Sequence, residues 1–275
     1  MNDNIFSRFE LHLTKKYGQN FLTDQAVLEK IAQDADIADG TVVEIGAGAG
    51  TLTRVLGKYA KKVVAFEIDN NLQPVLKEML HGYDNVQLVM GDIMRYDTAQ
   101  VEAMCGGSYS VVANIPYYIT TPIVMKFVEE GKNLVSLTLT IQKEVAERLA
   151  AHCGTKQYGA ITVAVNAVAD VEITQILPRT LFRPQPNVDS AVVKITMRRN
   201  KFDIDDRAMF RKTVKTAFSM RRKTLVNNLC NGFALTKEKA AEILQTCNLP
   251  INCRGEQLSP QQFVLLANCL NRQQG

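Results

Sequence analysis

Four consecutive residues, Asn114-Ile115-Pro116-Tyr117, carry the groups best suited to chemistry in this chain. They offer a side-chain amide, a backbone carbonyl ahead of a proline, the fixed backbone of that proline, and an aromatic face. Such a set of groups is suited to binding a planar group that carries an exocyclic amine. The alternative is a plain turn between a strand and a helix, because Asn and Pro are common in turns.

Three earlier positions would share a site with this tetrapeptide. Residues 110–113 form a short β-prone run, so Asn114 lies where a buried strand is expected to end. Gly46, Glu67 and Asp92 each lie at the end of another expected strand. Because ligands of open α/β sheets bind outside the carboxyl ends of the strands, these positions predict one binding site.

A glycine-rich run, Gly46-Ala47-Gly48-Ala49-Gly50, joins the first expected strand to a helix. Glycines at such a place let a ligand approach the backbone closely. The pattern is GxGxG rather than the dinucleotide-binding GxGxxG, which favours a nucleoside without phosphates over NAD. S-adenosylmethionine fits that description, although a tight turn without a ligand would show the same pattern.

Two carboxylates would complete a nucleoside site. Glu67 lies 21 residues after Gly46, where an acid can accept hydrogen bonds from both hydroxyls of a ribose. Asp92 follows Gly91 and could accept one from an adenine amine, or it could cap the next helix. Asn114 then lies where the sulfonium methyl group would point.

The elements that position these residues alternate between strand and helix. We expect strands at residues 41–45, 62–66, 86–90, 110–113 and 135–141, with helices at 51–59, 72–80 and 122–130. This alternation predicts βαβ units and a parallel sheet of the α/β class, covered on both faces. Two further strands, 171–177 and 191–197, flank a loop with three prolines, which suggests a hairpin-like pair at the sheet edge.

From about Asn200 the pattern is purely helical, so we expect an α/β domain over residues 1–200 and a small all-helical domain over 201–275. Either Asp205 or Asp206 would cap a basic helix. Near the end of the chain, Ser259-Pro260-Gln261-Gln262 reads as a capping box that opens a last helix.

The basic helix would bind a polyanionic partner. Seven Lys or Arg residues and no acid lie between Arg207 and Leu229, which exceeds what solubility needs and favours contacts with phosphate groups. An ordinary solvated helix face is the alternative. We expect the phosphate contacts from Arg211, Lys215, Arg221, Arg222 and Lys223.

The composition bounds the class of protein. A hydrophobic fraction of 46% and a charged fraction of 22% are those of a soluble globular protein, and the uneven distribution of its +4 net charge favours a polyanionic partner. None of the six cysteines lies in a CxxC pair, and the three histidines do not cluster with them, so we expect no metal site. Without an apolar leader or membrane-length stretch, the sequence predicts a cytoplasmic protein, by default a monomer.

Together these motifs resemble those of the rRNA adenine N6,N6-dimethyltransferases, most closely of the bacterial KsgA (RsmA) type. The resemblance runs from about Tyr17 to the C-terminal helices, with Ile115 where the family mostly has Leu. It rests on Gln19-Asn20-Phe21-Leu22, Glu44-Ile45-Gly46-Ala47-Gly48, Glu67, Gly91-Asp92, the tetrapeptide, and residues 182–190 with the pattern Phe-x-Pro-x-Pro-x-Val-Asp-Ser.

The resemblance implies a Rossmann-like class I methyltransferase sheet with a small helical C-terminal domain. It implies S-adenosylmethionine as the methyl donor, with Asn20 and Leu22 forming another wall of its site. It also implies the acceptor: two adjacent adenines near the 3′ end of small-subunit (16S) rRNA, within an immature small ribosomal subunit.

The residue chemistry agrees with that implied activity. An aromatic amine is a poor nucleophile because its lone pair is delocalised into the ring. If the side-chain oxygen of Asn114 and the carbonyl of Ile115 accept its two N–H bonds, the lone pair is localised and aimed at the methyl, with no metal or strong base. Pro116 fixes the backbone of this turn.

Two aromatic rings would hold the target base. We expect Tyr117 and Phe182 to stack on the two faces of a flipped adenine. Phe182 lies in a loop rich in proline, which is a poor place for a core residue and so favours the stacking role. Either ring could instead be structural.

Other functions stay open from the sequence. The protein could methylate large-subunit rRNA, as the Erm enzymes do, or amines in DNA or in protein glutamine, because Asn-x-Pro-Tyr occurs in all these classes. It could also be chiefly a non-catalytic binding factor for ribosome assembly. The 182–190 loop and the basic helix favour small-subunit rRNA, and the complete set of site residues argues against lost catalysis.

Overall fold

The computed structural model describes residues 20–274, with side chains to residue 273, and the chain forms two compact units. The first unit comprises residues 20–146 and 172–197, and the second comprises 147–171 and 198–274. Tyr17 and Gln19, where the family resemblance begins, lie outside the described residues.

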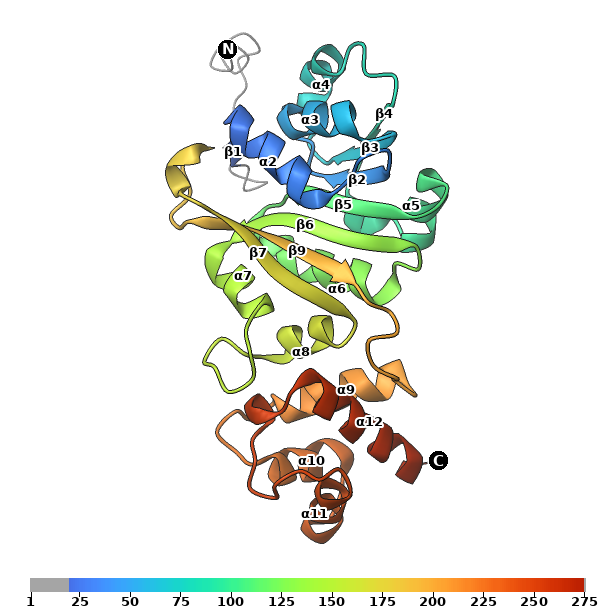
Figure 1. Ribbon diagram of the computed structural model, residues 1–275, viewed down its shortest axis with the longest axis vertical. Helices are drawn as coiled ribbons and strands as arrows, with labels where there is room; N and C mark the ends of the chain where they lie inside the picture. The colour runs from blue at the N-terminus through green and yellow to red at the C-terminus, as the bar shows by residue number, and fades with distance from the viewer. Residues whose placement is uncertain (1–19, 275) are drawn as a thin grey trace. The chain divides into compact units, whose positions relative to one another are not determined.

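The first unit is built on a seven-stranded sheet with the strand order β4-β3-β2-β5-β6-β9-β7 (Figure 1). Neighbouring strands from β4 to β6 run parallel, and β9 is antiparallel to β6. The predicted parallel α/β sheet is thereby confirmed, as is the pair of strands at its edge. The strands span Thr41–Ile45 (β2), Lys62–Glu67 (β3), Val86–Met90 (β4), Tyr109–Asn114 (β5), Leu134–Gln142 (β6), Ala169–Leu177 (β7) and Ser190–Met197 (β9).

The central strands are buried on both faces. In β2 and β3 successive side chains, which point to opposite sides of the sheet, are all buried from Val42 to Ile45 and from Val63 to Glu67. Such strands are recognisable as apolar runs, which explains why their predicted limits agree with the structure to within one residue.

The connecting helices follow the strands in the expected alternation. Asp24 caps α2 by accepting from Val27 N at 3.1 Å. Helix α5 was not predicted, although Asp97 and Gln100 form a complete capping box at its start. The helices are α2 (Gln25–Ala35), α3 (Thr51–Tyr59), α4 (Gln73–Met79), α5 (Thr98–Cys105), α6 (Thr120–Glu130) and α7 (Lys143–Leu149), with 3₁₀ turns η2 (Asn70–Leu72), η3 (Ile93–Arg95), η4 (Tyr117–Ile119) and η5 (Arg179–Leu181).

A second, two-stranded sheet links segments far apart in sequence. Strand β1 (Phe21–Leu22) pairs antiparallel with β8 (Phe182–Arg183), and Leu22 lies opposite Phe182. The N-terminal segment is thus joined by backbone pairing to the proline-rich loop that precedes β9.

The second unit is mainly helical. Asp206 caps α9 by accepting from Met209 N at 2.8 Å. Ser259 and Gln262 form the predicted capping box of α12. The unit contains α8 (Ala160–Asn166), α9 (Arg207–Ala217), α10 (Leu225–Phe233), α11 (Lys237–Thr246), the 3₁₀ turn η6 (Gly255–Gln257) and α12 (Pro260–Gln274).

The basic region is two helices and a turn, which corrects our expectation of one basic helix. Helix α9 ends at Ala217 and α10 begins at Leu225, so the three cations from Arg221 to Lys223 lie between them. The buried side chain of Asn228 stabilises this break, because its amide donates to the carbonyls of Ala217 (2.8 Å) and Met220 (3.3 Å). Carbonyls at a helix end need such partners.

The two units do not coincide with the two domains that we expected. The chain passes between units at residues 146/147, 171/172 and 197/198, and the last of these points is close to the predicted boundary near residue 200. Residues 147–171, which the prediction places with the α/β domain, group with the C-terminal helices. The domain limits 1–200 and 201–275 stay a prediction.

Candidate active site

One cavity in the first unit collects the residues that the sequence singled out. It is bordered by the carboxyl ends of β2, β3, β4 and β5, which lie side by side in the sheet (Figure 1). The structure brings these residues together; their roles toward a ligand stay predictions. All the predicted cofactor residues line the cavity, together with every predicted catalytic residue except Phe182: Asn20, Leu22, Gly46, Gly48, Glu67, Asp92, Asn114, Ile115, Pro116 and Tyr117.

The glycine run forms a tight loop because its glycines adopt conformations that other residues avoid. Gly46 and Gly48 have φ angles of 78° and 59°. Gly48 is also constrained sterically, since a Cβ atom there would lie 2.9 Å from Cε1 of Phe21. The loop therefore fits closely under the β1 segment that brings Asn20 and Leu22 to the cavity.

Glu67 ties the glycine loop to the end of β3. Its Oε2 accepts from Gly48 N at 2.7 Å, and its Oε1 accepts from Asp69 N at 2.8 Å. Burial raises the pKa of this carboxyl, while the two backbone N–H groups oppose the rise. Each oxygen has more than one lone pair, so the carboxylate can still accept from ribose hydroxyls as we predicted.

Asp92 acts as a cap and lines the cavity as well. Its Oδ1 accepts from Met94 N at 2.9 Å at the start of η3. The two interpretations that the sequence left open are thus compatible, because one carboxylate can serve both partners.

Asn114 has a defined orientation. Its Nδ2 donates to the backbone carbonyl of Asn20 at 2.9 Å. A carbonyl only accepts, so the NH₂ group of the amide must face Asn20, and Oδ1 is left as the acceptor of this side chain. An amine that enters the cavity donates hydrogen bonds through its N–H groups, so it requires such an acceptor.

Tyr117 is held by its hydroxyl group. The phenol oxygen lies 2.8 Å from Ser190 Oγ, at the first residue of β9, and the ring is half-buried at the cavity. Burial raises the pKa of the phenol, which therefore stays neutral at ordinary pH. The bond physically connects the tetrapeptide with the last residue of the 182–190 segment.

Phe182 is placed differently from our expectation. A ring in a proline-rich loop was expected to stay out of the core, but its side chain is 1% exposed and packs in the cluster with Phe21 and Leu22. Strand β8 pairs with β1, and Phe182 belongs to the same cluster of buried residues as Phe21, Leu22 and Leu177, which is the physical reason for its burial. That premise was wrong, and stacking of Phe182 on a base, which would need an accessible ring, stays an untested prediction.

Several cavity residues were not predicted to have a role in the site. Glu44 is 1% exposed, and neither of its carboxylate oxygens has a hydrogen-bond partner among the described residues. Burial raises the pKa of this carboxyl to about 8; the nearby Thr53 hydroxyl opposes the rise, and the charge of Glu67 adds to it. Ile68, Met94 and Tyr118 are unusually exposed for apolar side chains and line the same cavity. Each of these three residues lies within two positions of a predicted site residue, Glu67, Asp92 or Tyr117, and this proximity in sequence could have identified them.

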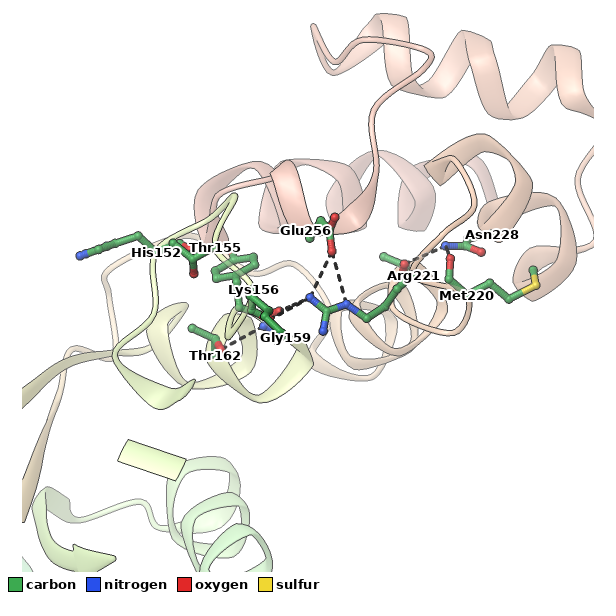
Figure 2. A network of polar contacts seen from close by, with 11 residues as sticks. His152, Thr155, Lys156, Gly159, Thr162, Met220, Arg221, Asn228 and Glu256 are labelled. Atoms are coloured by element: carbon green, nitrogen blue, oxygen red, sulfur yellow. Dashed lines mark hydrogen bonds and ion pairs between the residues drawn. The ribbon is translucent and has the colours of Figure 1, made fainter. Parts of the chain in front are cut away.

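The predicted RNA-binding residues differ in their surroundings. Arg211 and Lys215 are exposed on α9, and Arg222 and Lys223 are exposed in the turn that follows it. Arg221 instead donates to Glu256 and to two backbone carbonyls, as Figure 2 shows.

Neither a metal centre nor a membrane span is found within residues 20–274. No group of three or more His, Cys, Asp or Glu side chains there could hold a metal ion. No helix in the same range is long and apolar enough to cross a membrane.

A parallel sheet whose strand ends carry a glycine loop, an acid and Asn-Ile-Pro-Tyr around one cavity defines a Rossmann-like methyltransferase. The chain belongs to the ribosomal RNA adenine dimethylase family, whose profile matches residues 11–272. The predicted family is thereby confirmed.

Individual relatives agree with this membership. The chain is 45% identical over 271 residues to ribosomal RNA small subunit methyltransferase A of Clostridioides difficile (strain 630), covering 97% of this chain and 94% of that relative. It is 43% identical over 274 residues to the protein of the same name from Geobacillus thermodenitrificans (strain NG80-2), with the same coverage.

Two crystal structures share the fold over most of this chain. A dimethyladenosine transferase from Plasmodium falciparum has a TM-score of 0.79 at 26% identity, covering 92% of this chain and 98% of that one. The 23S rRNA methyltransferase ErmE has a TM-score of 0.71, also at 26% identity, covering 92% of this chain and all of that one.

Proposed function

We propose that this protein transfers methyl groups from S-adenosylmethionine to the exocyclic amines of two adjacent adenines near the 3′ end of small-subunit rRNA, giving N6,N6-dimethyladenosines. In this proposal the substrate is the rRNA of an immature small ribosomal subunit, and the enzyme acts in the cytoplasm. The orientation of Asn114 carries the proposal, because its fixed amide leaves an oxygen acceptor at the end of β5.

The cavity fits the proposed methyl donor. S-adenosylmethionine carries a sulfonium and an ammonium group, and the cavity acids Glu67 and Asp92 offer negative charge to such a ligand. The exposed apolar side chains of Ile68 and Met94 suit the faces of a nucleobase, and Asp92 suits its amine. When bound, the donor supplies an electrophilic methyl group.

The protein's own residues then act by positioning. The Asn114 Oδ1 and the Ile115 carbonyl accept the two N–H bonds of the adenine amine and so localise its lone pair toward the methyl group. Tyr117 supplies a ring face held in place through Ser190. The amine proton passes to solvent after transfer, so no strong base is required.

A methyl-transfer assay with competing substrates tests the proposal. The intact protein is given tritiated S-adenosylmethionine and, in parallel, undermethylated small subunits, large subunits, free rRNA and DNA, and the products are digested to nucleosides. We expect label in N6,N6-dimethyladenosine from small subunits. Label in large-subunit rRNA would instead favour the activity named for ErmE, which resembles this chain in fold.

A binding factor without catalysis is the remaining alternative. It predicts retention of small subunits on the protein and no labelled nucleoside from any substrate. The complete set of cavity residues supports the enzyme, since a protein that only binds subunits needs no glycine loop or buried acids.

A further inference from the structure

Two segments of the second unit meet at the side chain of Arg221. The basic turn (residues 218–224) joins α9 to α10, and the exposed loop (residues 152–157) precedes the buried Tyr158. Arg221 Nη2 donates to the carbonyls of Lys156 (3.1 Å) and Tyr158 (3.2 Å). Figure 2 shows the guanidinium between the loop and the third partner, Glu256.

Glu256 neutralises the guanidinium. Its Oε2 accepts from Nη2 at 3.1 Å and from Nε at 3.3 Å. A phosphate that approached Arg221 would meet this carboxylate, and the like charges would repel each other. The ion pair is partly solvated, with 48% of the arginine side chain exposed, so its main effect is to orient the planar fork of donors.

Other bonds hold the exposed loop from the side of η6. Gly154 N donates to the carbonyl of Glu256 at 2.7 Å, and the Tyr158 hydroxyl donates to the carbonyl of Leu258 at 2.7 Å. Arg221 adds the link to the basic turn. A loop of this kind is flexible unless it is tied, and ordering it during binding would cost affinity.

Three cations lie on the two segments that this link joins. Lys156, Arg222 and Lys223 are exposed, and no hydrogen bond or ion pair of their side chains is found within the described part of the chain. The backbone carbonyl of Lys156 accepts from Arg221, so the loop that carries Lys156 is joined to the turn that carries Arg222 and Lys223.

We infer that Arg221 is a positioning residue rather than a phosphate ligand, and that it assembles Lys156, Arg222 and Lys223 into one basic ridge for an RNA backbone. The identity of the partner as RNA rests on the proposed function; the structural role of Arg221 does not. Sequence reasoning missed Lys156 because this residue lies outside the basic segment from Arg207 to Leu229.

Hydrogen exchange on the free protein tests the positioning role without RNA. Arg221→Lys keeps the positive charge but lacks the planar fork, and Arg222→Lys is the matched control. We expect the amide of Gly154 to exchange about tenfold faster in Arg221→Lys and to be unchanged in Arg222→Lys, because loss of one such link favours local opening. Unchanged exchange in Arg221→Lys would overturn the positioning role.

The salt dependence of binding to a small-subunit rRNA fragment tests the ridge. Each of Lys156→Gln, Arg222→Gln and Lys223→Gln should lower the slope of log affinity against log salt by about 0.7–0.9, as expected for one lost phosphate contact. Arg221→Gln should change the slope by less than half of that. An equal loss of slope in Arg221→Gln would make it a phosphate ligand, and unchanged slopes in the other three would remove the ridge.

These outcomes are separable from the proposed function. If the wild-type protein fails to methylate small-subunit rRNA, the exchange experiment still decides the role of Arg221. If exchange is unchanged while methylation proceeds, only the present inference fails.

Discussion

Replacing Glu44 by Gln should stabilise the protein at neutral pH, and increasingly so as the pH rises. The carboxyl is 1% exposed and has no hydrogen-bond partner among the described residues, and its pKa is raised from 4.5 to about 8. In the unfolded chain the same group ionises near its ordinary pKa. The folded protein therefore binds the proton more tightly, and stability falls as the pH rises from about 4.5 to about 8.

The magnitude follows from this difference in pKa. Each pKa unit corresponds to about 1.4 kcal/mol, so complete ionisation costs the folded state on the order of 4–5 kcal/mol. Between about pH 5.5 and 7.5 the loss is about 2–3 kcal/mol. Gln cannot ionise, and a buried amide without partners resembles the protonated acid in cost, so the two proteins should be similar in stability at low pH.

Urea unfolding of wild type and Glu44→Gln at several pH values, without cofactor, measures this difference. The free-energy difference between them should grow by about 2–3 kcal/mol from about pH 5.5 to 7.5. Glu242→Gln, at an exposed position, serves as the control and should show almost no such trend. A difference between wild type and Glu44→Gln that is independent of pH would refute the argument that burial keeps this acid protonated.

Three further substitutions test the cavity. Gly48→Ala should destabilise the protein by about 1–3 kcal/mol and weaken cofactor binding, because Gly48 has a φ of 59° and an added Cβ would meet Phe21. Thermal unfolding and calorimetry measure these two effects, and unaltered values would contradict the close fit of the glycine loop. Glu67→Gln should lower cofactor affinity by about tenfold in calorimetry, since a charged acceptor is lost, and equal affinity would reject the ribose contact. Tyr117→Phe should keep the ring but lose the hydrogen bond to Ser190, so turnover should fall several-fold. Tyr117→Ala removes the ring as well and should lose far more turnover. Equal losses of turnover in the two variants would reject stacking of Tyr117 on the base.

The sheet could be predicted from sequence because burial on both faces leaves a local signal. Strand β2, whose residues from Val42 to Ile45 are all buried, was predicted at its observed limits, residues 41–45. The site followed from the sheet, since strand ends of a parallel sheet must share an edge. Helix α5 was missed although the capping box of Asp97 and Gln100 was present in the sequence.

Contacts between distant segments could not be predicted in this way. The burial of Phe182 depends on pairing with Leu22, which lies in another part of the chain. The role of Arg221 depends on Glu256 and on the loop carbonyl of Lys156, and neither is near it in sequence. Local sequence patterns indicate which contacts a residue is able to make, whereas partners from distant segments determine which contacts it makes in the fold.

The central claim is that the oriented amide of Asn114 prepares the adenine amine for transfer. Single-turnover transfer of tritiated methyl to undermethylated small subunits, at saturating cofactor, tests it in wild type, Asn114→Ala and the exposed control Asn133→Ala. We predict that Asn114→Ala loses about 10²–10³-fold in rate while its affinity for rRNA is unchanged, and that the control retains the wild-type rate. Transfer by Asn114→Ala at a rate comparable to wild type would contradict the account.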